Sequence, residues 1–137
     1  MQRDLVQPAG LGRELGPYTH AFSVDPKSFS RLVFISGQVA TDHTGTVVGA
    51  GDMRAQFVQV YANLQTVLEA AGGTLANIVS LRTFLTRADD LPLFNECRRE
   101  HYPRLFPDGV FPPNTLLIID RLVLPELLLE IEAVAAI

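Results

Sequence analysis

The segment PPNTLLIIDRLVLPELLLEIEAVAAI, residues 112–137, decides the fold because it holds two strand-like apolar runs. The runs are residues 116–119 and 127–131, and the second contains Glu130, with Glu132 directly after it. Side chains alternate between the two faces of a strand, so both carboxylates are expected on one face and the apolar residues between them on the other. Burying an unpaired carboxylate is costly, so the acid-bearing face should meet water, a partner group or a ligand. The closing segment is therefore predicted to be both a core strand and a candidate site.

The composition describes one compact domain with its own core. The chain has 137 residues, of which 47% are hydrophobic and 19% charged, as is typical of a folded globular protein. The low share of charged residues and the mean hydropathy of +0.20 indicate that a monomer would have too few polar residues to cover its surface. This favours oligomerisation. We therefore expect a single domain over residues 1–137 that associates with further copies of itself.

Charge, cysteine content and the length of apolar runs exclude several classes of function. A formal net charge of −4 argues against a nucleic-acid partner, which generally requires a basic face. The single cysteine rules out an internal disulfide and fits a reducing compartment. No apolar run reaches the roughly 20 residues that cross a bilayer, and the N-terminus lacks the apolar run of a signal peptide. The expectation is a cytoplasmic protein without a membrane partner.

The first third of the chain predicts short strands separated by loops. Proline and glycine punctuate residues 1–17, which favours an irregular N-terminal segment. A weak alternation over residues 19–24 is compatible with an edge strand, and LVFIS at 32–36 predicts a clearer strand that ends at a glycine. Turn-forming residues at 42–46 predict a reversal, followed by a returning strand at residues 47–48.

Two helices are predicted in the rest of the chain. Asp52 is a suitable N-cap for a helix that runs to about Ala71 and is stopped by the two glycines that follow. Its apolar residues recur at helical spacing and form one stripe, which consists of Phe57, Tyr61, Leu64, Leu68 and Ala71. Asp89 or Asp90 can cap a second helix from about Leu91 to Tyr102, after which Pro103 breaks the chain.

The strand between these helices completes the predicted architecture. Residues 78–86, IVSLRTFLT, predict a main strand with Val79, Leu81, Thr83 and Leu85 on one face. With the two closing strands, the predicted order is β-β-β-α-β-α-β-β. This order predicts an α+β domain in which two helices pack on one face of a mixed sheet and the other face is left to be covered.

Short motifs along the chain resemble those of the Rid family, the YjgF-type reactive-intermediate deaminases. The motifs are, in order, GPY at 16–18, ISGQV at 35–39, LEAAGG at 68–73, Asn95, and Pro113 with LEIEA at 129–133. LEAAGG alone is weak evidence, but the ordered set covers nearly the whole chain. The resemblance implies a chorismate-mutase-like α+β fold that assembles as a homotrimer around a central barrel, with ligand clefts between neighbouring subunits.

The resemblance also implies a chemistry. Archetypal family members hydrolyse enamines and imines, such as 2-aminoacrylate and its tautomer 2-iminopropionate, to a 2-keto acid and ammonia, and they use no metal or organic cofactor. Carried over to this chain, Glu130 would be the catalytic residue that positions the hydrolytic water. Tyr18, Gly37 and Asn95 would bind the small-molecule substrate, Gly37 through its backbone groups. A carboxylate within hydrogen-bond reach of water can accept its proton as the water attacks an imine carbon.

One position departs from the family pattern. Deaminating members carry an arginine two residues beyond the proline that starts the closing strand pair, and this arginine forks onto the substrate carboxylate. Counting from Pro113 reaches Thr115 in this chain, and counting back from Glu130 reaches the same residue. Threonine brings no charge, and the lost fork is worth about 1.5–3 kcal/mol of substrate binding. A replacement cation would have to come from a neighbouring subunit, for example Arg82 or Arg104.

Each candidate residue also has a structural explanation. Glu130 fits a solvent-facing strand position, Tyr18 the edge of a core, and Asn95 the surface of the second helix. Thr115, which would line the cleft as a substrate-binding residue, is also an ordinary β-former at the start of a strand. Glu132 is interpreted as a structural or ion-paired surface acid.

The other reactive residues are assigned structural roles. Cys97 and His101 share a helix face, but nothing nearby completes an activated nucleophile, so a buried or semi-buried thiol is expected. The histidines lie on different elements without metal-ligand spacing, so no metal site is predicted. The basic residues Arg98, Arg99 and Arg104 are interpreted as a solvated helix face.

Three functions remain open. The first is a Rid-like trimer that binds a small carbonyl, enamine or imine metabolite and hydrolyses it as a cofactor-independent hydrolase. The second is a non-catalytic member that binds a metabolite or a protein partner, because Thr115 stands in place of the arginine. The third is a pathway-specific hydrolase with a more apolar cleft, which Phe111, Leu116 and Leu117 suggest.

Overall fold

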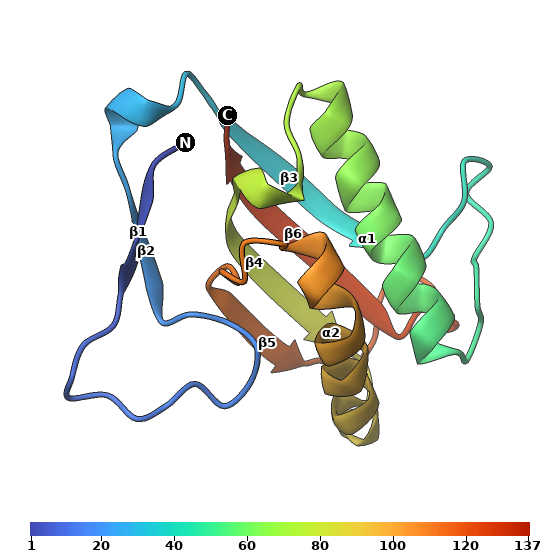
Figure 1. Ribbon diagram of the computed structural model, residues 1–137. Helices are drawn as coiled ribbons and strands as arrows, with labels where there is room; N and C mark the ends of the chain where they lie inside the picture. Colours follow the sequence, from blue (N-terminus) through green and yellow to red (C-terminus); the bar gives the residue numbers. More distant parts are fainter.

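A four-stranded mixed sheet carries both helices of the protein, as the computed structural model of residues 1–137 shows (Figure 1). The strand order is β3-β6-β4-β5. β6 pairs antiparallel with both β3 and β4, whereas β4 and β5 run parallel and are joined through a helix. The bounds are β3 (Leu32–Val39), α1 (Met53–Ala70), β4 (Ile78–Leu85), α2 (Leu91–Leu105), β5 (Asn114–Ile118) and β6 (Leu129–Ala136).

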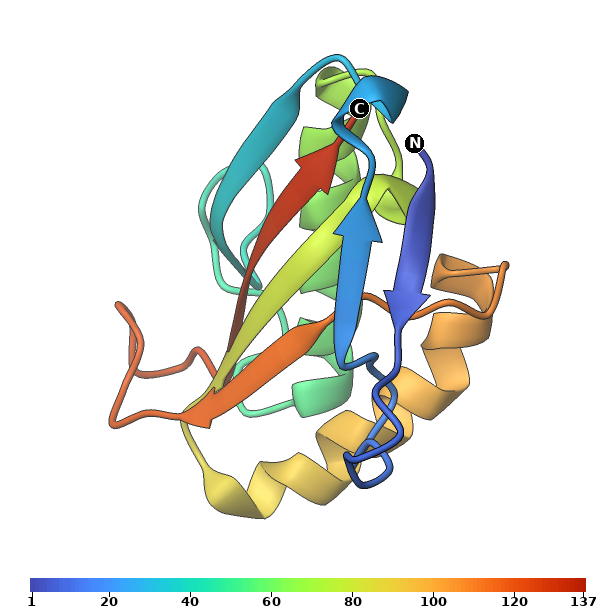
Figure 2. The same cartoon turned by 90° about the vertical axis from the view of Figure 1, so that its left-hand side faces the viewer.

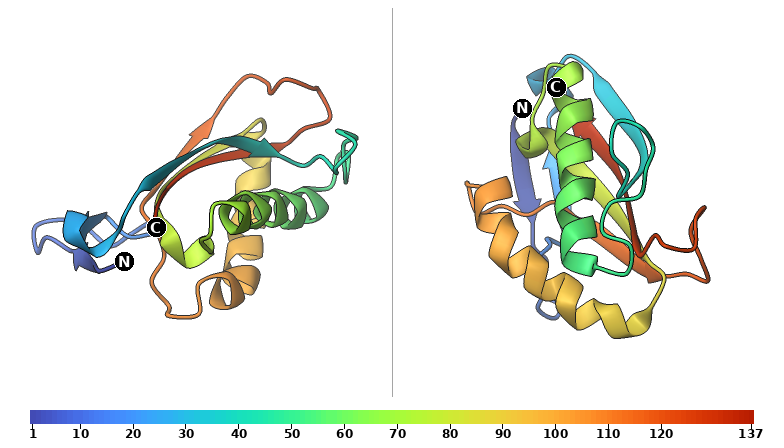
Figure 3. Two further views of the ribbon diagram at one scale, coloured as in Figure 1. Left: turned by 90° about the horizontal axis from the view of Figure 1, so that it is seen from above. Right: turned by 90° about the vertical axis from the view of Figure 1, so that its right-hand side faces the viewer.

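Both helices lie on the same side of this sheet, as the view from above shows (Figure 3). Three short 3-10 helices lie in the connections, at Pro26–Ser28, Leu75–Asn77 and Ala88–Asp90. The predicted α+β class with a mixed sheet and two helices on one face is thus confirmed. No helix combines the length and the apolar character that crossing a bilayer requires.

The closing strand β6 lies in the middle of the sheet and alternates as its sequence predicts. Leu129, Ile131 and Ala133 are buried under the helices, while Glu130 and Glu132 are half-buried on the opposite face. Because β6 is flanked by a strand on each side, the alternation of its side chains decides which of them reach the core.

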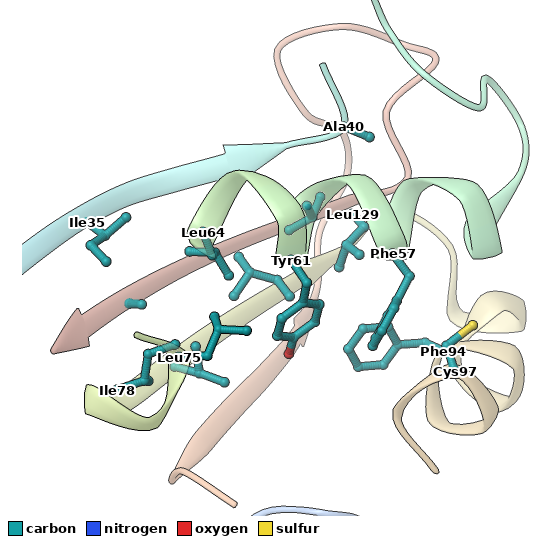
Figure 4. Packing of buried hydrophobic residues seen from close by; sticks show 14 of the residues in the cluster. Ile35, Ala40, Phe57, Tyr61, Leu64, Leu75, Ile78, Phe94, Cys97 and Leu129 are labelled. Atoms are coloured by element: carbon teal, nitrogen blue, oxygen red, sulfur yellow. The ribbon is translucent and has the colours of Figure 1, made fainter. Parts of the chain in front are cut away.

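Helix α1 begins and ends where its sequence predicts. The Asp52 carboxylate accepts hydrogen bonds from the backbone N–H groups of Arg54 and Ala55, which are otherwise unpaired at a helix start. At the other end Gly72 has a φ of +82°, a conformation that glycine adopts without a steric penalty. Four residues of the predicted apolar stripe pack into the core between the sheet and α2, and Figure 4 shows three of them, Phe57, Tyr61 and Leu64, together with Leu129 and Phe94. Ala71, the fifth, is the half-buried C-cap and lies outside the core.

Helix α2 begins at Leu91 as predicted, but its capping contact and its C-terminal end differ from the prediction. Asp90 occupies the N-cap position but makes no capping bond, because the Arg87 guanidinium holds its carboxylate at 2.7 and 3.0 Å. Pro103 lies inside the helix, which continues to Leu105. A proline there leaves the carbonyl of residue 99 without its helical partner, and residue 99 is exposed, so water can take the place of the missing N–H group.

The N-terminal segment contains a strand that the sequence did not predict. β1 (Arg3–Val6) pairs antiparallel with β2 (Ala21–Val24) in a separate two-stranded sheet, so residues 1–17 are not wholly irregular. β2, expected as an edge strand, makes no pair with the main sheet. Figure 2 shows this hairpin beside the main sheet, with the connecting loop reaching toward α2. Arg3 ties it to the body through the Ala76 carbonyl, at 2.7 Å, and through Asp108.

Three further details depart from the sequence-based expectation. β3 continues through Gly37 to Val39, with an irregular register between Ile35 and Gln38. The returning strand at residues 47–48 is reduced to one isolated bridge, because the Asp42 side chain closes a tight turn by accepting N–H groups from residues 44 and 46. At the start of β4 a register shift turns Ile78, rather than Val79, into the core.

Candidate functional site

Gly37 and Glu130 meet where β3 and β6 pair. A β-carbon on residue 37 would lie 1.8 Å from Oε1 of Glu130, so only glycine leaves room for the carboxylate in this position. Gly37 does not have a positive φ, so a lack of side-chain volume, rather than special backbone geometry, is what the position requires. The structure therefore brings these two predicted site residues into contact.

The Glu130 carboxyl has an unusual electrostatic environment. Partial burial, and secondarily the negative charge of Glu132, raise its pKa above 4.5. No hydrogen bond to the carboxylate counteracts this shift. Glu132 instead forms an ion pair with Arg82 at 2.5 Å, as expected for a structural surface acid. A carboxylate with a raised pKa and no donor of its own is a better proton acceptor than an exposed one.

A second group of predicted residues lines a cavity of about 240 Å³ under the N-terminal loop. We call it the N-loop cavity, and its lining residues are Leu15, Gly16, Tyr18, Leu91, Asn95, Arg98, Asn114 and Leu116. Two of the predicted site residues, Tyr18 from the loop and Asn95 from α2, are thereby brought together. The Tyr18 hydroxyl accepts a hydrogen bond of 3.3 Å from the backbone N–H of Leu15, which holds the loop in a closed turn.

Arg98 is the charged residue of the N-loop cavity, and its burial was not predicted. It is only 4% exposed, whereas the neighbouring Arg99 and Arg104 are exposed, so the expected solvated basic face is wrong for Arg98. Its Nη2 donates to Oδ1 of Asn95 at 2.5 Å, and its guanidinium lies 5.0 Å from the centre of the Phe94 ring. The sequence does carry a signal, since Phe94, Arg98 and Tyr102 follow one another at intervals of four on one helix face.

Thr115 faces away from the N-loop cavity. It is in register with Arg82, and both residues line a separate cavity of about 320 Å³ on the helix-free side of the sheet, together with Glu132. Arg82 belongs to the same chain, so a cation lies next to Thr115 without a contribution from a neighbouring subunit. That cation is already paired with Glu132.

Asn114, one residue earlier, is the polar β5 residue that shares the N-loop cavity with Tyr18 and Asn95. Its Oδ1 accepts a hydrogen bond of 2.8 Å from the Thr83 hydroxyl. Asn114 was not among the predicted site residues, because two consecutive prolines precede the strand: a count of two residues from Pro112, instead of Pro113, reaches Asn114. In a strand, a difference of one residue reverses the face on which a side chain lies.

Cys97 is a structural residue. It is fully buried, and burial raises the pKa of its thiol, which is the opposite of what a thiolate nucleophile requires. The adjacent His101 ring packs 5.4 Å from the ring of Phe57. The expected buried thiol is confirmed.

The fold and the ordered motifs define a member of one family. The chain belongs to the family described as endoribonuclease L-PSP, which matches residues 13–137, and the resemblance to Rid proteins is confirmed. The 3-aminoacrylate deaminase RutC of Acinetobacter baylyi is 30% identical over 135 residues, which cover 98% of each chain. The Rid-family protein YyfB of Yersinia pestis has a solved structure that matches with 36% identity, a TM-score of 0.83 and full coverage of both chains. RidA from an Antarctic Psychrobacter matches with 26% identity, a TM-score of 0.64 and coverage of 98% of this chain and 99% of that one.

Proposed function

We propose that this protein is a cofactor-independent hydrolase that converts a small enamine or imine to a carbonyl compound and ammonia. The observation that carries the proposal is the placement of Glu130, whose carboxylate has a raised pKa, makes no hydrogen bond within the chain and stands over Gly37. The name of one relative, a 3-aminoacrylate deaminase, supports the same reaction class.

The reaction needs only a positioned base and water. Glu130 accepts a proton from water as the water oxygen forms a bond to the imine carbon. Glu130 passes this proton to the imine nitrogen, which gives a carbinolamine; it then takes the proton of the new hydroxyl group and delivers it to the same nitrogen, so that the C–N bond breaks, ammonia leaves and the carbonyl group remains. The Gly37 backbone stands close enough to this carboxylate to contact the same ligand.

The site of this reaction is proposed to be a cleft between subunits of a chorismate-mutase-like homotrimer. In a single chain the candidate residues form separate groups: Tyr18 and Asn95 in the N-loop cavity, Gly37 with Glu130 at the β3–β6 pair, and Thr115 on the helix-free face. A second copy placed against the helix-free face would bring such groups together. Phe34 on that face is 77% exposed, which supports its burial by another copy.

The test is ammonia release from freshly generated 2-iminopropionate, together with light scattering at micromolar concentration. Glu130→Gln should reduce turnover by about a hundredfold or more, while the matched variant Glu132→Gln, two residues along the same strand face, should retain most of it. A protein that stays monomeric would contradict the shared cleft. Equal activity of wild type and Glu130→Gln would contradict the role of Glu130.

A non-catalytic binding protein is the second candidate. It is favoured by the neutral side chains that β5 offers, Asn114 in the N-loop cavity and Thr115 on the other face. Saturable binding of a small carbonyl metabolite, with no turnover of imines with or without a carboxylate, would identify this alternative.

A further inference from the structure

The guanidinium of Arg98 is buried without the partners that a buried charge normally has. Its Nε and Nη1 are shielded from solvent and make no hydrogen bond. No carboxylate of the chain forms an ion pair with it. A buried charge that lacks a counter-ion lowers the stability of the fold by several kcal/mol unless something else compensates it.

The neighbours of Arg98 compensate this charge only in part. Asn95 supplies one neutral acceptor, and Phe94 supplies the face of an aromatic ring. Burial raises the pKa of the Tyr102 hydroxyl, and the positive charge of Arg98 lowers it by a smaller amount. No hydrogen bond of ordinary geometry joins the two groups. These contacts orient the guanidinium and leave its charge without a negative partner.

The N-loop cavity next to Arg98 has the composition of a site for a small anion. None of its lining residues is acidic, and Arg98 is its only charged one. Asn114 adds an amide whose oxygen is already engaged by Thr83 and whose nitrogen makes no hydrogen bond within the chain. Leu91 and Leu116 form apolar parts of the cavity wall. Such surroundings lower the local dielectric constant and so strengthen the attraction between the guanidinium and an anion.

We propose that Arg98 is an anion-binding residue of this protein and that the N-loop cavity takes the carboxylate group of a small ligand. A guanidinium N–H donates a strong, charge-assisted hydrogen bond to a carboxylate oxygen. A single guanidinium balances the one charge of a carboxylate but not the greater charge of a phosphate. Asn95 acts as a positioning residue, because it holds Nη2 at 2.5 Å.

Gly16 is the residue that admits the guanidinium under the N-terminal loop. A β-carbon on residue 16 would lie 2.8 Å from Nη2 of Arg98. The loop therefore passes directly over the guanidinium. At Gly16, as at Gly37 beside Glu130, an added β-carbon would clash with a charged side chain. Helix α2 contributes the guanidinium of Arg98, and the N-terminal loop lies over it at Gly16.

The experiment measures binding and needs no turnover, so it remains informative if the proposed hydrolase activity fails. Pyruvate is the carboxylate probe, pyruvamide its neutral counterpart, and inorganic phosphate the competing anion, each titrated into the full-length protein by calorimetry. Arg98→Met should weaken pyruvate binding about ten- to a hundredfold, which is the loss of one charge-assisted pair. Arg99→Met, one residue along the same helix and exposed, should bind pyruvate like wild type.

Stability distinguishes this role from a structural one. If Arg98 binds an anion, Arg98→Met should be at least as stable as wild type in the absence of ligand, because an unpaired buried charge has been removed. If Arg98 is structural, the same variant should be destabilised, with no specific loss of pyruvate binding.

A second variant tests the site with the arginine retained. Asn95→Asp places a carboxylate on the atom that already accepts from Nη2. It should raise the free energy of unfolding and abolish pyruvate binding, because the site then contains its own anion. Pyruvamide or phosphate binding as tightly as pyruvate to wild type would overturn the proposal, as would unchanged pyruvate binding in both Arg98→Met and Asn95→Asp.

Discussion

Gln56, fully buried on α1, holds the chain that leads into β6 by accepting a hydrogen bond from the backbone N–H of Leu128 at 2.8 Å. Its amide nitrogen donates to two carbonyls, Gly49 at 3.0 Å and Glu126 at 2.8 Å. One side chain therefore fixes the loop before α1 and the loop before β6, and through the latter the approach to Glu130.

Gln56→Leu should lower the free energy of unfolding by about 2–3 kcal/mol, because backbone groups of both loops lose their partner. Chemical denaturation measures the change. The matched control is Gln65→Leu on the same helix, where the side chain bonds only Glu69 at the surface and the change should stay within about 0.5 kcal/mol. Equal effects of the two substitutions would contradict a bridging role for Gln56.

Gly37→Ala should displace the Glu130 side chain and abolish hydrolysis while the protein still folds. The new β-carbon meets only a flexible side chain, so the loss of stability should be about 1 kcal/mol. The double-mutant cycle with Glu130→Ala is the measurement: once the carboxylate is gone, Gly37→Ala should lower the stability much less. A full, additive loss in the double variant would show that residue 37 clashes with something else.

Glu130→Gln should stabilise the protein at neutral pH, with a gain that depends on pH. The pKa of Glu130 is raised in the folded state, so the folded protein holds this proton more tightly than the unfolded chain does. The stability that Glu130 contributes is therefore fully present below its unfolded pKa, near 4.5, and is lost as the pH rises through the folded pKa. The advantage of Glu130→Gln should appear over that range and then level off.

Unfolding free energies of wild type and Glu130→Gln, measured from pH 3 to pH 8, provide the test. The sign of the change in stability with pH decides the test, because burial and the charge of Glu132 both oppose ionisation of Glu130. A gain that grows as the pH falls would contradict the assignment. A carboxyl resonance that titrates below 4.5 would contradict it directly.

The hydroxyl groups of Tyr61 and Tyr102 lie 2.7 Å apart in the core and connect α1 to α2. Burial, the largest effect on both groups, raises the pKa of each hydroxyl, so neither ionises at neutral pH. Tyr61→Phe should destabilise by about 1–2 kcal/mol because the Tyr102 hydroxyl loses its partner, and the double phenylalanine variant should lose less than the sum of the single ones. Thermal unfolding of the three variants gives the comparison.

Much of the fold was predictable because its signals are local. The stripe of α1, its Asp52 cap and the alternation of β6 each follow from residues a few positions apart, and each is confirmed. β1 was not predictable in this way, because its exposed residues are ordered by pairing with residues 21–24 and by the contacts of Arg3 with Ala76 and Asp108. Those partners are distant in sequence.

The candidate site, too, contains residues whose placement could be predicted from local sequence and residues whose placement depends on distant contacts. The contact between Gly37 and Glu130 agrees with the motifs that suggested both residues. Arg98 was interpreted as a surface residue because composition favours exposed arginines, and its burial follows only from the way the N-terminal loop covers α2. Asn114 and Thr115 are neighbours in β5, so their side chains lie on opposite faces of the sheet. A count of two residues from the proline reaches one or the other, depending on which of the two adjacent prolines is taken as the start.

The hairpin formed by β1 and β2 has a consequence for protein engineering. It makes no backbone pair with the main sheet, yet the loop that it carries supplies Gly16 and Tyr18 of the N-loop cavity. One wall of the cavity therefore resides in a part of the chain that does not set the register of the main sheet, while the rest of its lining comes from α2 and β5. Exchanging residues 1–24 for those of a relative would therefore replace one wall of the cavity and leave the strand pairing of the main sheet unchanged.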